Sequence, residues 1–277
     1  MVKLFATDLD GTLLNGDHES DAIIEQGINA VFESGHYFTV ATGRHYHQVP
    51  VRYSNTHGYY VCLNGALIVD SLGNVIHESL IDKTVLSEFI DKFHDMNFEY
   101  ISKDHIYTFM DEATHQTSLK KAFLEMGEEV SWIDKFMYDN FKNTVFCATK
   151  QQILEAPICK INVHRHKDQD YSIAETYLVS STAIMNTPSD PEMMEITACG
   201  VSKASALKWL ASMLGISEEA VYVYGDGGND IEMLRAFSHS FAPCNASEVA
   251  KDVASTIIGP FEDHSVIAHI QDMIKQK

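Results

Sequence analysis

Basic residues are scarce in this sequence. Its 277 residues include 20 Lys and Arg against 39 Asp and Glu, which gives a formal net charge of −19. Binding to nucleic-acid phosphates or to anionic membrane surfaces depends on many basic contacts, so we expect neither as a partner. The acidity is not that of a disordered chain, because 45% of the residues are hydrophobic and only 21% are charged. The composition therefore predicts a folded protein with a large core.

Cysteine and long apolar runs are also limited. The number of cysteines is odd, at five, and they form neither a CxxC pair nor the spacing of a zinc site. We interpret them as buried thiols in a reducing compartment. The first eight residues lack the basic and apolar regions of a secretion signal, and no apolar run reaches the roughly 18 residues of a transmembrane helix. These absences predict a cytoplasmic location.

Short apolar runs alternate with helical patterns near both ends of the chain. Residues 2–6, 37–41 and 59–63 have the composition of buried strands with helices between them. The pattern returns with an amphipathic helix over 202–214 and a strand over 221–224. Strands and helices that alternate at these lengths indicate parallel βαβ units.

The middle of the chain has a different pattern, in which helices mix with alternating strands. We predict that residues 82–186 form a separate α+β domain inserted into the first one. The remaining segments, 1–81 and 187–277, are predicted to form one α/β domain around a doubly wound, mostly parallel sheet.

Polar clusters follow three of the predicted strands. They are Asp8-Leu9-Asp10-Gly11-Thr12, Thr42-Gly43-Arg44 and Gly225-Asp226-Gly227-Gly228-Asn229-Asp230. The carboxyl ends of strands in an open α/β sheet meet at the ligand crevice, so the acids of the first and third clusters are expected to face one another. Anions so close together require a cation or raised pKa values. Ligation by oxygen alone, completed by waters, suits Mg²⁺.

Each of these residues also has a structural explanation when taken alone. An Asp at a strand end commonly stabilises a turn, and Thr42 could cap the next helix. Lys203 could be a solvated helix residue. Their joint occurrence, in this order along the chain, favours a functional site over these separate structural roles.

The same residues resemble the motifs of the haloacid dehalogenase-like (HAD) hydrolases. The string from Phe5 to Leu13 is similar to their DxDGT motif, and Thr42-Gly43-Arg44 is similar to the second motif. Lys203 resembles the third motif and Gly225 to Asp230 the fourth. The resemblance spans nearly the whole chain in the right order.

A subgroup is indicated by the inserted segment, which resembles the large α+β cap of Cof-type sugar-phosphate phosphatases in length and placement. Three shorter strings are also similar to that subgroup: Leu63-Asn64-Gly65-Ala66, Met194-Glu195-Ile196 and Val201-Ser202-Lys203. Two strings depart from its usual pattern, at 243–246 and at 262–266. Neither departure touches the four motifs.

The resemblance implies phosphoryl transfer through an aspartyl phosphate on Asp8, with Asp10 as general acid and base. It also implies Mg²⁺, held by Asp8, by Asp226 and by the main-chain carbonyl of Asp10. Asp230 would act through a metal-bound water or by orienting Lys203. Contacts to the phosphate or to the rest of the substrate are implied for Thr12, Thr42, Gly43, Arg44, Asn64, Lys203 and Asn229, with Thr42 and Lys203 also acting in catalysis. The cap would set specificity.

The expected activity is therefore that of a phosphatase acting on a small phosphorylated metabolite, with a sugar phosphate as the best candidate. Two alternatives remain open. One is a phosphomutase on the same scaffold, which shares the first half-reaction. The other is a regulatory module phosphorylated on Asp, which the position of Asp10 and the inserted domain disfavour. A monomer and a homodimer are both compatible with the sequence.

Overall fold

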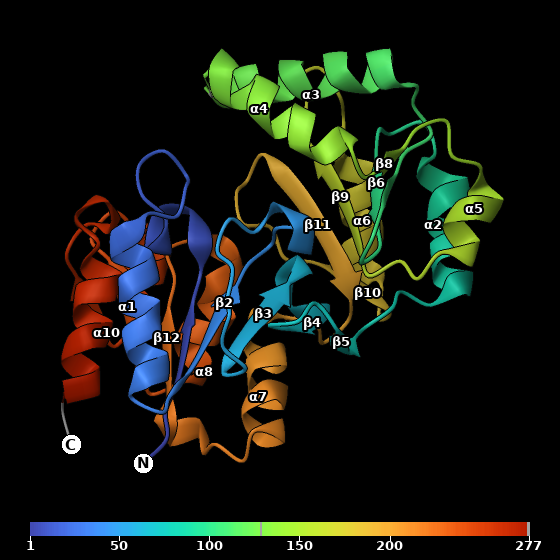
Figure 1. The fold of residues 1–277 in the computed structure, drawn as a ribbon. Helices are drawn as coiled ribbons and strands as arrows, with labels where there is room; N and C mark the ends of the chain where they lie inside the picture. The colour runs from blue at the N-terminus through green and yellow to red at the C-terminus, as the bar shows by residue number, and fades with distance from the viewer. Residues whose placement is uncertain (128, 276–277) are drawn as a thin grey trace. The chain divides into compact units, whose positions relative to one another are not determined.

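The computed structural model describes residues 1–127 and 129–275. The chain is an α/β protein that divides into two compact units, each built around its own sheet (Figure 1). Unit 1 combines Met1–Glu78 with Val201–Lys277, and unit 2 is the inserted Ser79–Gly200. The predicted fold class, a doubly wound α/β core with an inserted α+β domain, is confirmed.

Unit 1 contains an eight-stranded sheet in the order β14-β13-β12-β1-β2-β3-β4-β5. The strands from β14 to β3 are parallel, and β4 and β5 add an antiparallel hairpin at one edge. The bounds are β1 (Leu4–Thr7), β2 (Tyr37–Ala41), β3 (Gly58–Cys62), β4 (Leu67–Asp70), β5 (Val75–Glu78), β12 (Val221–Tyr224), β13 (His239–Pro243) and β14 (Thr256–Ile258). Because β1 pairs with both β2 and β12, it lies inside the sheet, and its carboxyl end is in the middle of the row of strand ends.

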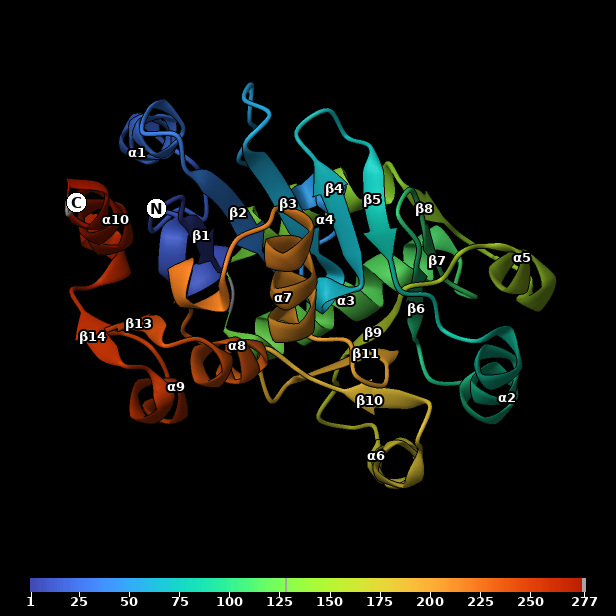
Figure 2. The same ribbon diagram turned by 90° about the horizontal axis from the view of Figure 1, so that it is seen from below.

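Helices cover both faces of this sheet (Figure 2). The helices of unit 1 are α1 (Ala22–Glu33), α7 (Lys203–Met213), α8 (Ile231–Ala236), α9 (Glu248–Val253) and α10 (Ser265–Lys275). Alternate residues of β1 point to opposite faces, so that Leu4 and Ala6 pack with α7, α8 and α9, while the ring of Phe5 packs against Tyr222. Both faces are therefore apolar, which leaves the ends of the strands for polar groups.

Unit 2 contains a six-stranded sheet in the order β10-β11-β9-β6-β7-β8. Its strands are β6 (Glu99–Ile101), β7 (Ile106–Tyr107), β8 (Thr144–Val145), β9 (Lys160–His164), β10 (Ile184–Asn186) and β11 (Met193–Ala198). Its helices are α2 (Lys83–Phe93), α3 (Glu112–Met126), α4 (Val130–Phe141), α5 (Lys150–Glu155) and α6 (Ser172–Ser180). Apolar side chains of β6, β9 and β11 pack with α2, α5 and α6 in one core.

The boundary between the units differs from the prediction. Residues 187–200 belong to unit 2 rather than to the core, because β11 pairs with β9 and β10 in the antiparallel sheet. Met194 and Ile196 form an apolar run that the sequence pattern does not distinguish from a core strand. At the first junction the structure divides the chain after Glu78 instead of after residue 81.

One further expectation is affected. The interpretation of all five cysteines as buried thiols is wrong for Cys147, Cys199 and Cys244, which are exposed, and holds for Cys62 and Cys159. Among the described residues, no helix combines the length and apolar content that crossing a bilayer requires.

A buried ion pair joins β9 to β11 inside unit 2. The Lys160 ammonium bonds to the Glu195 carboxylate, and both side chains are only 3% exposed. Burial by itself raises the pKa of Glu195, but the charge of Lys160 and its hydrogen bond outweigh this effect and lower the pKa to about 2. The pair therefore contributes stability above the ordinary carboxyl range, and this contribution is lost as the pH falls from about 4.5 towards 2.

We expect Glu195→Gln to destabilise the protein by about 3–5 kcal/mol at pH 7, because the substitution leaves Lys160 buried without its counter-ion. The double variant Lys160→Met with Glu195→Leu should recover most of this loss, since neither charge of the pair remains buried. Urea unfolding at pH 7 measures both effects. A single variant as stable as the wild type would show that the pair adds nothing to stability.

Candidate active site

Asp8 lies in the middle of the row of strand ends at the carboxyl side of the sheet in unit 1. It directly follows β1, and its N–H donates to the carbonyl of Tyr224 on β12 at 2.9 Å. This hydrogen bond extends the parallel pairing by one residue and brings the carboxyl ends of β1 and β12 together. The acids that follow the two strands are thus neighbours in space, as the motif positions predict.

Lys203 is the cation of this site. It is the first residue of α7, where Ser202 caps the helix by accepting a hydrogen bond from the N–H of Ser205. Its side chain is fully buried, and Nζ lies 2.6 Å from Oδ1 of Asp8 and 2.7 Å from Oδ1 of Asp230. Burial alone lowers the pKa of a lysine, but Asp230 and Asp8 together hold the pKa of Lys203 well above its ordinary value. The residue is therefore charged, and the solvated-helix explanation is wrong.

Asp226 and Asp230 lie on the turn that follows β12. Oδ2 of Asp230 accepts hydrogen bonds from the N–H groups of Asp226 and Gly227 at 3.0 and 2.9 Å, which fixes the turn. Thr12 donates its hydroxyl to Oδ1 of Asp226 at 2.6 Å. Thr12, predicted to contact substrate, thus contacts the acid Asp226 on this turn.

Gly11 lets the first motif pass close to this turn. It has a φ of +71°, and a Cβ built on it would lie 2.5 Å from Oδ2 of Asp226. A side chain at this position would meet both a backbone penalty and a clash. The turn at Gly11 therefore leaves the carboxylate of Asp226 open on that side.

Three carboxylates, those of Asp8, Asp226 and Asp230, each place an oxygen within 4.8 Å of the others. Burial, followed by repulsion from the neighbouring acids, raises the pKa of Asp8 well above its ordinary value. The same causes, burial first and then Asp230, raise the pKa of Asp226 to about 7. The three acids have only the ammonium group of Lys203 among them, and it contacts Asp8 and Asp230, so the cluster has a deficit of positive charge. Hard oxygen donors with such a deficit fit Mg²⁺.

Asp10 has different partners from the three clustered acids. Nε of Arg44 donates to Oδ2 of Asp10 at 2.7 Å, and the Nη2 group of Arg44 contacts Oδ1. Nδ1 of His18 lies 3.0 Å from the same Oδ1. Burial would raise the pKa of Asp10, but the charge of Arg44, followed by the contacts from His18, holds it well below its ordinary value. The carboxylate of Asp10 is therefore ionised and clamped.

Thr42 and Gly43 follow β2, the neighbour of β1. Thr42 is buried, and its hydroxyl accepts a hydrogen bond from the N–H of Arg44 at 3.1 Å. Gly43 lies half-buried in the bend between these two residues. Arg44 therefore contacts Asp10, a partner that the sequence did not predict for it.

Asn64 and Asn229 contact each other across the site. Nδ2 of Asn229 donates to Oδ1 of Asn64 at 3.0 Å. Asn64 is buried, has a φ of +57°, and donates its N–H to the carbonyl of Thr42 at 3.0 Å. The two amides, predicted to contact substrate, thus also connect the loops after β2, β3 and β12.

Two residues outside the four motifs belong to this constellation. His18 contacts Asp10, and Asn245 donates to the carbonyl of Gly11 at 2.9 Å while its Oδ1 accepts from the N–H of Phe261 at 3.2 Å. Asn245 stands in one of the two strings that depart from the Cof-type pattern. His18 had no signal in the sequence, because its role depends on a loop conformation rather than on a motif.

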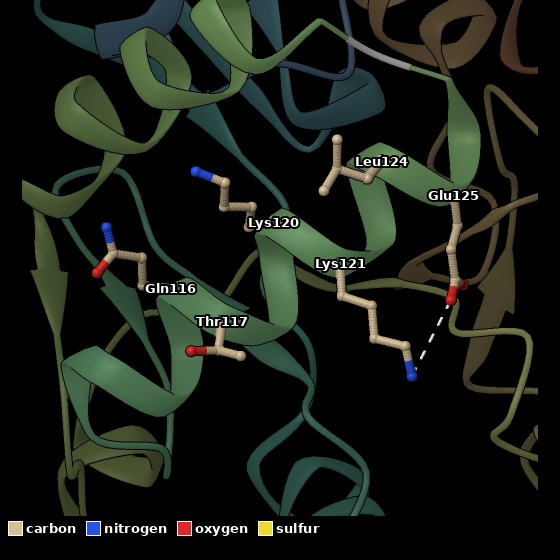
Figure 3. A pocket seen from close by; sticks show the side chains of 6 residues that line it. All are labelled: Gln116, Thr117, Lys120, Lys121, Leu124 and Glu125. Atoms are coloured by element: carbon tan, nitrogen blue, oxygen red, sulfur yellow. Dashed lines mark ion pairs between the residues drawn. The ribbon is translucent and has the colours of Figure 1, made fainter.

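A shallow hollow of about 490 Å³ along α3 lies outside this constellation (Figure 3). It is lined by Gln116, Thr117, Lys120, Lys121, Leu124 and Glu125. Both of its cations are engaged, since Lys120 pairs with Asp134 at 3.3 Å and Lys121 with Asp168 at 2.6 Å. The hollow is therefore a solvated helix face with satisfied charges.

Comparisons with known proteins show the family of this chain. The family profile described as haloacid dehalogenase-like hydrolase matches residues 5–270. Phosphatase YwpJ of Bacillus subtilis strain 168 is 28% identical over 291 residues, covering 97% of this chain and 98% of that protein. The 5-amino-6-(5-phospho-D-ribitylamino)uracil phosphatase YwtE of the same strain is 25% identical over 287 residues, covering 99% and 98%. A solved structure of a haloacid dehalogenase-like hydrolase from B. subtilis shares 23% identity and a TM-score of 0.82, covering 98% of this chain and 99% of that one.

The fold, the site and these matches define an enzyme of the phosphatase type. The chain belongs to the haloacid dehalogenase-like hydrolase family, since the family profile covers nearly its whole length. The family membership expected from the four motifs is confirmed.

Proposed function

We propose that this protein hydrolyses the phosphate ester of a small phosphorylated metabolite through an aspartyl phosphate on Asp8, with Mg²⁺ as cofactor. The observation that carries the proposal is the buried contact of Lys203 with Asp8 and Asp230 beside the acid of Asp226. A carboxylate backed by one buried cation and by a group of acids suits phosphoryl transfer better than it suits acyl or hydride transfer.

Asp8 would attack phosphorus with one carboxylate oxygen, so that the bond to the leaving oxygen breaks as the acyl-phosphate bond forms. Lys203 offers positive charge next to Asp8, where it offsets the approach of two anions. Water would then attack the phosphorus and release inorganic phosphate, which regenerates the carboxylate. Thr42, Gly43, Asn64 and Asn229 would contact the phosphoryl oxygens or the rest of the substrate.

Asp10 would take the proton of the attacking water and give a proton to the leaving oxygen. Its contacts with Arg44 and His18 keep it ionised, as the step that removes a proton from water requires, and the lowered pKa also makes it a weaker base. In the other half-reaction the carboxyl group must hold a proton, and the Arg44 pair opposes this. Asp10 in this arrangement therefore has the protonation state of the base step.

Mg²⁺ would be held by Asp8 and Asp226, with Asp230 beside them and the main-chain carbonyl of Asp10 as a further oxygen. When bound, the ion would supply Lewis-acid charge against the phosphate. Support for this assignment comes from the oxygen-only donor set and from the raised pKa values of Asp8 and Asp226.

A sugar or polyol phosphate is the substrate class we propose. The relative YwtE is named for a compound with a phosphate on a ribityl chain. The resemblance of the inserted domain to Cof-type caps points in the same direction.

Release of inorganic phosphate from a panel of phosphorylated metabolites, measured with Mg²⁺ present, tests this proposal. We expect turnover with at least one sugar or polyol phosphate. An isomerised monophosphate without phosphate release would instead identify a mutase. A stable phosphoprotein without turnover would identify a regulatory module.

Chelation by EDTA should reduce turnover by at least about 100-fold, since the acid cluster then lacks the charge that offsets the substrate phosphate. Added Mg²⁺ should restore the rate. Unchanged turnover after exhaustive chelation would contradict the cofactor assignment. Thermal unfolding with and without Mg²⁺ gives a second readout, because an ion that binds the folded cluster raises Tm.

A further inference from the structure

A histidine outside all four motifs contacts Asp10. Nδ1 of His18 lies 3.0 Å from Oδ1 of Asp10, on the carboxylate that Arg44 also binds. An ionised carboxylate only accepts hydrogen bonds, so Nδ1 is the donor. The guanidinium and the imidazole together leave the carboxylate little freedom to rotate.

The loop that carries His18 is tied together by Asn15. Oδ1 of Asn15 accepts hydrogen bonds from the N–H groups of Asp17 and Glu19, both at 3.0 Å. The main chain of Asn15 bonds to that of Glu19 at 3.1 Å and to that of His18 at 3.0 Å. Five consecutive residues thus form one closed turn with His18 near its tip.

The end of this turn is anchored to two other segments. Nδ2 of Asn15 lies 3.4 Å from Oδ2 of Asp21, the residue that caps α1. The same Oδ2 lies 2.7 Å from Nε2 of His264. The turn is therefore connected to the start of α1 and to the segment before α10, which limits its movement.

The backbone of His18 has a left-handed conformation. Its φ is +58°, in a region that is uncommon for residues other than Gly and in which Asn, Asp and His are enriched. Such strained residues cluster at functional sites, where a specific contact outweighs the backbone cost. Here the strained residue is the one whose side chain reaches Asp10.

We propose that His18 is a positioning residue for Asp10, which aims the carboxylate at the proton that it transfers. This inference rests on the proposed function, since it assigns His18 a part in the same reaction. His18 acts through its hydrogen bond to Asp10 and does not itself exchange a proton with substrate. Arg44 supplies the positive charge that holds the carboxylate of Asp10, and the hydrogen bond from His18 fixes the orientation of that carboxylate.

A pair of variants separates the side chain from the backbone. Both Gly and Asn accept a positive φ, so His18→Gly and His18→Asn keep the turn without added strain. Asn retains a donor close to the position of Nδ1, whereas Gly has no donor. Asp17→Ala, an exposed position in the same turn, serves as the control.

We expect His18→Gly to lower kcat about three- to tenfold, with KM little changed, because ground-state binding of substrate does not depend on the aim of Asp10. His18→Asn should stay within about twofold of the wild type. The loss should be similar for a sugar phosphate and for p-nitrophenyl phosphate, since the water that attacks the acyl phosphate needs a base whichever group has left. All variants should keep the Tm of the wild type within about 2 °C.

The inference fails if the wild type is active and His18→Gly equals it on the sugar phosphate. It also fails if His18→Asn loses as much kcat as His18→Gly, or if the loss appears with the sugar phosphate alone. A wild type without Asp8-dependent phosphate release contradicts the proposed function and removes this inference with it. These results are distinguishable, because the last one appears before any His18 variant is measured.

Discussion

Asp8→Asn should reduce phosphate release by at least about 10⁴-fold, because an amide cannot form the acyl phosphate that the reaction requires. The fold should persist. The pKa of Asp8 is raised by burial and by neighbouring acids, so its negative charge is disfavoured in the folded state. Removing that charge relieves repulsion with Asp226 and Asp230 and offsets the loss of the contact with Lys203. Steady-state release of phosphate, together with thermal unfolding, measures both parts.

A matched control is available in the same unit. Asp17→Asn makes the same chemical change at an exposed position and should leave turnover unchanged. Acid-quenched wild-type enzyme should also carry phosphate on the peptide that contains Asp8, and the variant should carry none. Turnover retained by Asp8→Asn, or a phosphate found on another residue, would refute the assignment of the nucleophile.

Lys203→Met is expected to have the second large effect, on activity and on stability together. It removes the cation that lies between Asp8 and Asp230 and leaves both carboxylates buried without it. We expect turnover to fall by at least about 10³-fold and the free energy of unfolding to drop by about 3–5 kcal/mol. The stability deficit should be larger at pH 8 than at pH 5. Protonation of Asp8 and Asp226, whose pKa values are already raised, removes part of the repulsion at the lower pH.

Two further variants distinguish buried charge from general helix effects. Lys208→Met lies on the same helix, with a side chain 44% exposed, and should change stability by less than about 1 kcal/mol. Adding Asp230→Asn to Lys203→Met should recover part of the stability but none of the activity. Urea unfolding of the four proteins provides the comparison. An equal loss from Lys203→Met and Lys208→Met would argue against an electrostatic role for the buried lysine.

Much of the site could be predicted from the motifs, for a reason that lies in sheet geometry. Asp8 follows β1 and Asp226 follows β12, and parallel neighbours bring their carboxyl ends together whatever the sequence distance. Lys203 could be placed because it begins an amphipathic helix with a clear cap at Ser202. These features depend on local patterns, which a single sequence contains.

Other contacts could not be predicted, because they depend on which loops approach one another. Arg44 was expected at the substrate, which stays a prediction, and its guanidinium contacts Asp10, 34 positions away. His18 reaches the same carboxylate only because Asn15 closes a turn that places His18 at a positive φ. No motif or periodicity marks either contact.

The boundary of the inserted unit likewise combines features that local sequence patterns predict with pairings that depend on distant segments. The sequence by itself determined the order of the core elements, the acids of the site and the presence of an insertion, since apolar periodicity and motif spacing are local properties. Only the tertiary structure decided that β11 belongs to the inserted sheet, because pairing with β9 and β10 is a choice among distant partners. It also gave Asp10 a different partner from the clustered acids Asp8, Asp226 and Asp230, since Arg44 on the loop after β2 and Lys203 at the start of α7 contact different carboxylates.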